Sequence, residues 1–160
     1  MQKYNFIKST FNFSNAPIKR FVKIEKKEDS LKKLKDEISN IENCTLKNNS
    51  KNLVFADGDH DSGIMLIGEG PGQKEDEQGK PFVGDAGLLL NKMLAAINIK
   101  RNKVYVTNIV NYRPPENRKP NEVEINTYAP FIKKHISIIN PKLIISVSYT
   151  HLRAHETTRY

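Results

Sequence analysis

The chain has 160 residues, which is long enough for one domain with a hydrophobic core. It carries 26 Lys and Arg residues against 18 Asp and Glu, a net charge of +8, and 38% of its residues are hydrophobic. This composition excludes full disorder, and the 8 Gly and 8 Pro exclude a collagen-like or low-complexity chain. A single cysteine, Cys44, excludes a disulfide framework and an all-cysteine metal site within this chain.

The excess of positive charge is compatible with a polyanionic partner such as nucleic acid. Lys far outnumbers Arg, and Asn and Ile are abundant, which the bias of an AT-rich genome explains equally well. Charge alone therefore leaves nucleic-acid binding open. No apolar run approaches the roughly 20 residues that a membrane-spanning helix needs, so no membrane association is expected. One unpaired thiol suits a reducing compartment, which favours a cytoplasmic protein.

The first part of the chain, residues 1–28, has no clear hydrophobic period and predicts a flexible N-terminal arm. Asp29-Ser30 can cap a helix that runs to about residue 43, with apolar residues on one face. Residues 44–62 predict a loop, within which the short apolar stretch 53–55 could form an edge strand.

From Ile64 onward, short apolar stretches that predict buried strands alternate with amphipathic stretches that predict helices. This alternation is typical of an α/β fold, with a parallel sheet covered by helices. Ligands bind such sheets outside the carboxyl ends of the strands. Pro130 is expected to break or kink the last helix. The expected elements are a strand at 64–67, a loop at 68–84, a helix from 85, a strand at 104–110, a loop at 113–120, a helix at 122–139 and a buried strand at 143–147.

The segment Gly68-Glu69-Gly70-Pro71-Gly72 directly follows the first of these strands. Alternate glycines let the backbone approach a ligand closely and point N–H groups at an acceptor. The segment is not a dinucleotide fingerprint, because its third glycine comes too early and no helix is expected to open there. It is not a P-loop, because no Gly-Lys-Ser/Thr follows. On its own it fits a ligand-binding loop and a tight structural turn equally well.

Several side chains near the expected crevice each have a functional and a structural interpretation. Phe82 lies on a glycine-flanked loop, where it could stack on a planar base or belong to the core. Asn108 could read a base edge or simply end its strand. Arg113 and Arg118 could pair with phosphates or remain solvated. The acidic residues at 75–77 could form an ordinary solvated loop surface.

Taken as one string, GEGPGQKEDEQGKPFVGDAGLLLNKML resembles the signature of the family 4 uracil-DNA glycosylases. Two supporting segments, VYVTNIVNYRPPENRKPNEVE and YAPFIKKHISIINPKLIISV, follow in the order of that family. The resemblance covers about residues 44–147. It implies a three-layer α/β/α sandwich around a central parallel sheet, incomplete at the C-terminus, with residues 29–147 as a partial glycosylase domain. It implies hydrolysis of the N-glycosidic bond of deoxyuridine in DNA, which leaves an abasic site in base-excision repair.

The resemblance also implies a pocket for an extruded uracil. Phe82 would stack on the ring, and Asn108 would read the polar edge with one donor and one acceptor. Gly68 and Gly70 would line the pocket, and backbone N–H groups around Gly70 would receive charge on the departing base.

The implied catalytic carboxylates are Glu69 and Glu75, either of which would stabilise the sugar cation or position the attacking water. Arg113 and Arg118 would contact DNA phosphates. The expected partner is uracil-containing DNA, bound by a monomeric, nucleoid-associated bacterial protein.

The sequence departs from the family at the positions that bind a four-iron, four-sulfur cluster. Of the four expected cysteines only Cys44 remains, and Lys47, Tyr112 and Tyr128 occupy the other three positions. Lys and Tyr supply no thiolate. We therefore expect no cluster and no other cofactor, as in a bacterial branch that lacks it, with an apolar and aromatic core in its place.

A second departure follows Val147, where the family continues with a His-Pro-Ser type motif that supplies a catalytic-site histidine. Residues 148–160 do not match that pattern and predict a tail foreign to the family, either disordered or an artefact of joined sequence, on a C-terminally truncated family member. His151 and His155 are not expected to replace the missing histidine. Two alternatives stay open: a module that binds uracil or nucleic acid without cleavage, and a glycosylase of the same fold for another damaged base.

Overall fold

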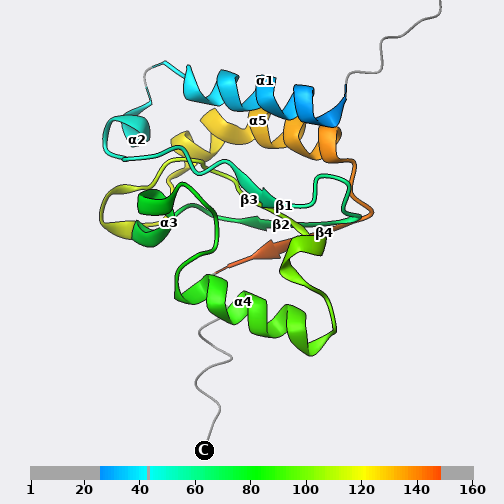
Figure 1. The fold of residues 1–160 in the computed structure, drawn as a ribbon. Coiled ribbons are helices and arrows are strands. Elements are labelled where there is room, and N and C mark those ends of the chain that lie inside the picture. The colour runs from blue at the N-terminus through cyan, green and yellow to red at the C-terminus, as the bar shows by residue number, and fades with distance from the viewer. Residues whose placement is uncertain (1–25, 43, 149–160) are drawn as a thin grey trace, which may run out of the picture.

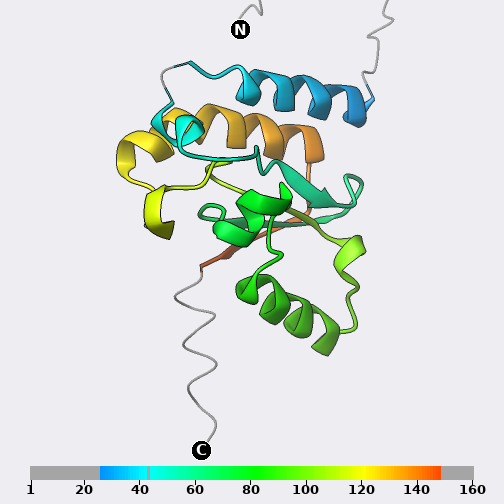
Figure 2. The same ribbon diagram turned by 60° about the vertical axis from the view of Figure 1, so that its left-hand side comes forward.

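The computed structural model describes residues 26–42 and 44–148, which form three layers (Figure 1). Helices α1 (Lys27–Ser39) and α5 (Glu122–Ile139) cover one face of a four-stranded sheet, and α4 (Asp85–Ala96) covers the other (Figures 1 and 2). This arrangement confirms the expected α/β/α fold. Residues 1–25 of the expected arm and residues 149–160 of the expected tail, with His151 and His155, lie outside the described residues. Lys27 and Glu28 belong to α1, so the expected arm boundary at residue 28 was wrong.

The sheet has the order β1-β3-β2-β4. The three strands expected from residue 64 onward are parallel, and Gly68 pairs with Asn108 on one side and Val147 on the other. The edge strand lies at 56–58 instead of 53–55, and it runs antiparallel to its neighbour. The strands are β1 (Ala56–Gly58), β2 (Ile64–Gly68), β3 (Tyr105–Asn108) and β4 (Leu143–Val147).

Alternate residues of β2 fill the cores on the two faces of the sheet. Met65 and Ile67 pack with Leu31 and Ile139 on the α1/α5 side, whereas Leu66 packs with residues of α4 on the other side. β4 differs from the expected buried strand, because its apolar side chains are half exposed in the described structure. Among the described strands β4 pairs only with β2, and Leu143, Ile144 and Ile145 are 42–51% exposed.

The segment expected to be a loop at 68–84 contains a short helix, α3 (Gln73–Gln78). The buried Asp76 carboxylate accepts hydrogen bonds from the backbone N–H groups of Lys51 and Asn52. Gly79 ends the helix in the left-handed region, at φ +67°. Six residues are too few for a helical hydrophobic period to be visible in the sequence.

Helix α5 continues through Pro130, so of the two expected effects, a break or a kink, the break was wrong. Asn121 and Glu124 form a reciprocal capping box at its start, with both hydrogen bonds at 2.8 Å. Tyr128, on the turn before Pro130, and His135, beyond it, are both fully buried. Proline removes one backbone hydrogen bond, and these burials and the cap offset that loss. In the described ranges no helix is long and apolar enough to cross a membrane.

Candidate active site

A pocket of about 670 Å³ opens at the carboxyl ends of β2, β3 and β4. Beyond the strands, the N–H of Ile109 donates to the Gly68 carbonyl (2.8 Å) and that of Val110 donates to the Glu69 carbonyl (3.2 Å), which keeps the two chain segments adjacent. The volume lies within the roughly 300–1,000 Å³ that is usual for small-molecule sites. The pocket is lined by residues from segments 69–77, 82–86 and 114–120, together with Asn108 and Val147.

Phe82 and Asn108 meet above Gly68. A Cβ atom placed on Gly68 would clash with Asn108 Oδ1 and would lie 2.7 Å from Cζ of the Phe82 ring. Both side chains also line the pocket. The structure therefore brings the two predicted base-binding side chains together, and this position requires a residue without a side chain.

The Asn108 amide has no hydrogen-bond partner within the described part of the chain, although the residue is only 3% exposed. Three residues later, the equally buried Asn111 donates from Nδ2 to the Val54 carbonyl at 3.0 Å. Among the described residues, Arg101 Nε is the only fully buried side-chain N or O atom without a partner, so the Asn108 amide atoms still reach the open space of the pocket. Asn108 thus presents an unsatisfied donor and acceptor to the pocket, whereas Asn111 ties β3 to the segment before β1.

The backbone of Phe82 lies in the left-handed region, at φ +55°. A residue other than glycine keeps such a conformation only where its surroundings hold it, at a cost of about 1–3 kcal/mol. Glu75 Oε1 accepts hydrogen bonds from the N–H groups of Val83 (2.9 Å) and Gly84 (2.7 Å). The Phe82 carbonyl also packs so closely on Gly87 that any Cβ there would overlap it.

The two predicted carboxylates therefore differ in their contacts. Glu75 lines the pocket, but one of its oxygens binds the backbone of the Phe82 loop. Glu69 is half-buried, and its Oε1 accepts a long hydrogen bond from the Ser148 hydroxyl (3.3 Å). Gly70 lies between them in the chain, under Val110, where an added Cβ would be 2.8 Å from Val110 Cγ2.

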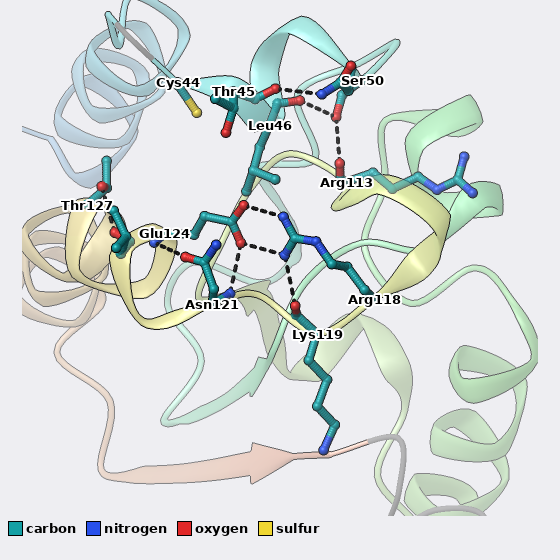
Figure 3. A network of polar contacts seen from close by, with 12 residues as sticks. Cys44, Thr45, Leu46, Ser50, Arg113, Arg118, Lys119, Asn121, Glu124 and Thr127 are labelled. Atoms are coloured by element: carbon teal, nitrogen blue, oxygen red, sulfur yellow. Dashed lines mark hydrogen bonds and ion pairs between the residues drawn. The ribbon is translucent and has the colours of Figure 1, made fainter.

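The two predicted phosphate-binding arginines also differ (Figure 3). Arg118 binds both oxygens of Glu124 (2.6 and 2.8 Å) and lowers the pKa of that carboxyl below its usual value. The Arg118 guanidinium therefore stabilises the first turn of α5. Arg113 donates from Nε to Asn117 Oδ1 (2.7 Å).

Sequence reasoning missed two lysines that line the pocket. Lys74 pairs with Asp85 (2.8 Å), whereas the Lys119 ammonium has no partner among the described side chains. Lys119 lies directly after Arg118 and before Pro120, in the expected loop at 113–120. The proline and basic residues of that loop were the sequence signal for this lysine.

Residues 55–158 match the family model of the uracil DNA glycosylase superfamily. The chain belongs to this superfamily. It is 40% identical over 124 residues to the type-4 uracil-DNA glycosylase of Pyrobaculum aerophilum, covering 78% of this chain and 63% of the relative. It is 42% identical over 120 residues to that of Sulfurisphaera tokodaii (74% and 54%), and 43% identical over 109 residues to that of Thermotoga maritima (68% and 57%).

These values confirm the resemblance seen in the sequence. The chain spans between about half and two thirds of the length of these type-4 relatives.

The four positions at which the superfamily resemblance implies cluster ligands hold a different arrangement. Cys44, Tyr112 and Tyr128 are buried in one hydrophobic cluster, and the Cys44 thiol and Tyr128 hydroxyl are 3.2 Å apart. Burial raises the pKa of both phenols. Lys47 donates from Nζ to the Ser39 carbonyl at 2.6 Å.

One thiol and two neutral phenols do not fit a four-iron, four-sulfur cluster, which needs four thiolates. The described residues include no group of three or more His, Cys, Asp or Glu side chains that could hold a metal ion.

Proposed function

We propose that this chain forms the base-binding part of a uracil-DNA glycosylase, which hydrolyses the N-glycosidic bond of deoxyuridine in DNA and leaves an abasic site. The observation that carries the proposal is the convergence of the Phe82 ring and the unpaired Asn108 amide above Gly68. The type-4 relatives support the same substrate by their names. The proposal rests on both lines together.

The pocket selects uracil by its face and its polar edge. The nucleotide leaves the duplex, because the glycosidic bond is inaccessible within the stack. Phe82 stacks on the flipped ring, and the Asn108 amide pairs with a neighbouring carbonyl and N–H of uracil. Cytosine presents the opposite pattern and would leave buried polar groups unpaired, which is costly.

Glu69 supplies the negative charge for bond cleavage. Cleavage develops positive charge on the sugar and negative charge on the base, so a carboxylate beside the sugar stabilises the first, or orients the water that attacks it. Backbone N–H groups around Gly70 receive the second. Glu75 contributes through its hydrogen bonds to Val83 and Gly84, which hold the Phe82 loop.

DNA phosphates bind to Arg113 and Lys119 rather than to Arg118, because the Arg118 guanidinium is paired with Glu124. The protein acts as a monomer in the bacterial cytoplasm, associated with the nucleoid. It needs no cofactor, and the Cys44–Tyr128 contact and its apolar surroundings replace the cross-linking role of a cluster. Visible iron–sulfur absorption in anaerobically purified protein would contradict this part of the proposal.

A second candidate is a module that binds uracil in DNA without cleaving it. It is favoured by the engagement of Glu75 Oε1 with two backbone N–H groups, which leaves fewer carboxylates available for catalysis.

A labelled oligonucleotide with one deoxyuridine separates the two candidates. We expect strand breakage after alkali treatment with uracil and none with thymine or hypoxanthine at the same position, and loss of breakage in Glu69→Gln. Retention of uracil-containing DNA on a gel without breakage would favour the binding module. Equal breakage at hypoxanthine would favour a glycosylase of broader specificity, and neither retention nor breakage would refute both.

A further inference from the structure

Arg101 connects three segments of the molecule at the edge of the Phe82 loop. It lies in the short 3₁₀ helix η1 (Arg101–Lys103) before β3. Its Nη2 donates to Asp57 Oδ2 of β1 (3.2 Å) and to the Pro81 carbonyl (3.0 Å), and its Nη1 is 3.4 Å from Asn91 Oδ1 of α4. The side chain is 20% exposed, and its Nε is buried without a partner in the described structure.

The Pro81 carbonyl immediately precedes the strained backbone of Phe82, at φ +55°. Glu75 holds the other side of this loop through the N–H groups of Val83 and Gly84. Phe82 is therefore fixed between two charged side chains, one bound to the peptide before it and one to the peptides after it. Such a conformation persists only where the surroundings over-determine it.

We propose that Arg101 is a positioning residue for base recognition, which orients the Phe82 ring over Gly68 by holding the Pro81 carbonyl. This role rests on the proposed function of the pocket. Arg101 is not among the residues that line the pocket, so its effect on the base is transmitted through the Phe82 loop. In the described structure the Arg101 guanidinium contacts its partners through Nη1 and Nη2, and the buried Nε makes no hydrogen bond.

The requirement is specific to arginine. The guanidinium reaches a carboxylate, a carbonyl and an amide oxygen at once, because its donors are spread over a rigid plane. A lysine ammonium is a single point on a flexible stem. Lysine at position 101 would pair with the Asp57 carboxylate, the stronger partner of an ammonium, and would lose the Pro81 contact.

The test uses two variants of Arg101. Arg101→Met removes all hydrogen-bond donors of the side chain. Arg101→Lys keeps the positive charge and serves as the variant to measure if Arg101→Met does not fold. Asp57→Asn is the matched control, because it removes the ion pair and leaves the Pro81 hydrogen bond. The first measurement is amide hydrogen exchange of the segment 79–84, which requires no DNA. We expect exchange there to be at least about 10-fold faster in both Arg101 variants and nearly unchanged in the control.

The second measurement is affinity for two DNA duplexes, one containing an uncleavable 2′-fluoro-deoxyuridine and one containing an abasic site. Both Arg101 variants should bind the uracil duplex about 10-fold more weakly, as expected for partial loss of base stacking. Both variants should bind the abasic duplex with the same affinity as the unmodified protein, because the abasic site presents no base to stack. A general loss of structure would weaken both.

Unchanged exchange of 79–84 in the Arg101 variants would refute the role of Arg101, whatever the protein binds. Equal weakening for the two duplexes would also refute it. If the unmodified protein binds uracil and thymine duplexes equally, the proposed function fails, and the exchange measurement still decides whether Arg101 holds the loop.

Discussion

Two regions of this molecule, which lie around the ends of β3, differ in whether their polar side chains have hydrogen-bond partners. In the core beneath α1 and α5, buried polar groups are paired: Cys44 with Tyr128, Tyr105 with His135, and Asn111 with Val54. At the pocket, the Asn108 amide faces the open space without a partner within the described structure, and Phe82 has a strained backbone.

Hydrogen-bond pairing therefore distinguishes residues that stabilise the fold from residues that can bind a ligand. Polar groups that are already paired stabilise the fold and offer nothing to a ligand. Unpaired and strained groups weaken the fold slightly and are available for a ligand that completes their hydrogen bonds. Variants of the two regions should therefore affect two different measurements.

The largest contrast is expected between Asn108→Ala and Asn111→Ala. Loss of a hydrogen-bonding group at the reacting base should lower kcat/KM for uracil excision by about 10²–10³-fold, with little change in the melting temperature. Asn111→Ala should instead lower the free energy of unfolding by about 1–3 kcal/mol, because it leaves the Val54 carbonyl unpaired, and should excise uracil normally while folded. Equal effects of the two variants on melting temperature would remove the distinction between the regions.

The second prediction concerns acid stability and His135. This residue is buried, with Nε2 2.6 Å from the Tyr105 hydroxyl and its ring stacked on Phe55. Burial lowers the pKa of His135 to about 4 from 6.5, so the unfolded chain takes up a proton at a higher pH than the folded protein. Stability should therefore be complete above about pH 6.5 and fall by up to about 3 kcal/mol as the pH drops to 4.

Urea unfolding at pH 7 and pH 4.5 measures this loss. His135→Gln has no group that titrates in this range, so it should flatten the dependence on pH. A variant that keeps the full loss would assign it to other groups.

A smaller effect is expected from the aromatic side of the pocket. Phe82→Leu keeps an apolar side chain but removes the stacking face, and it should lower kcat/KM for uracil excision about 10- to 100-fold. Phe82→Trp, with a larger stacking face, serves as the comparison and should retain more activity than Phe82→Leu if the wider ring fits over Gly68. Similar activity in Phe82→Leu and the unmodified protein would argue against stacking.

The smallest effect on stability is expected from loss of the contact between the Cys44 thiol and the Tyr128 hydroxyl. Tyr128→Phe removes the hydroxyl that lies 3.2 Å from Cys44 Sγ and should cost about 1 kcal/mol of stability in urea unfolding. Uracil excision should be unchanged, because Tyr128 is not part of the pocket lining. A loss of excision without a loss of stability would connect this core to the active site.

The sequence predicted those features that depend on a repeating pattern. The bounds of α5 and β4 agree with their apolar periodicity, and the parallel order placed the loops after β2 and β3 at one edge. It did not predict α3, which is too short to show a period. The continuation of α5 through Pro130 depends on burial of Tyr128 and His135, which a local proline rule does not include.

Individual partners were harder to predict than elements. Asn108 and Asn111 are alike in sequence, and only the packing of Asn111 against Val54 tells the bound amide from the unbound one. Arg118 faces Glu124 only because a loop and the first turn of α5 fold back on each other, so its pairing was not visible. The partners of Asp76 and Arg101 were not visible in the sequence either. The residues that bind Asp76 are 24 or more positions away, and those that bind Arg101 are 10–44 positions away.

The most direct test of the account follows the side-chain amide resonances of Asn108 and Asn111 by NMR in ¹⁵N-labelled protein. Each is assigned with the corresponding Asp variant, and DNA containing 2′-fluoro-deoxyuridine is then added. We expect the Asn108 amide resonances to shift with the uracil-containing duplex and not with a thymine duplex, while those of Asn111 remain in place. An Asn108 resonance that stays unchanged while the uracil-containing duplex is bound would contradict base recognition by this amide.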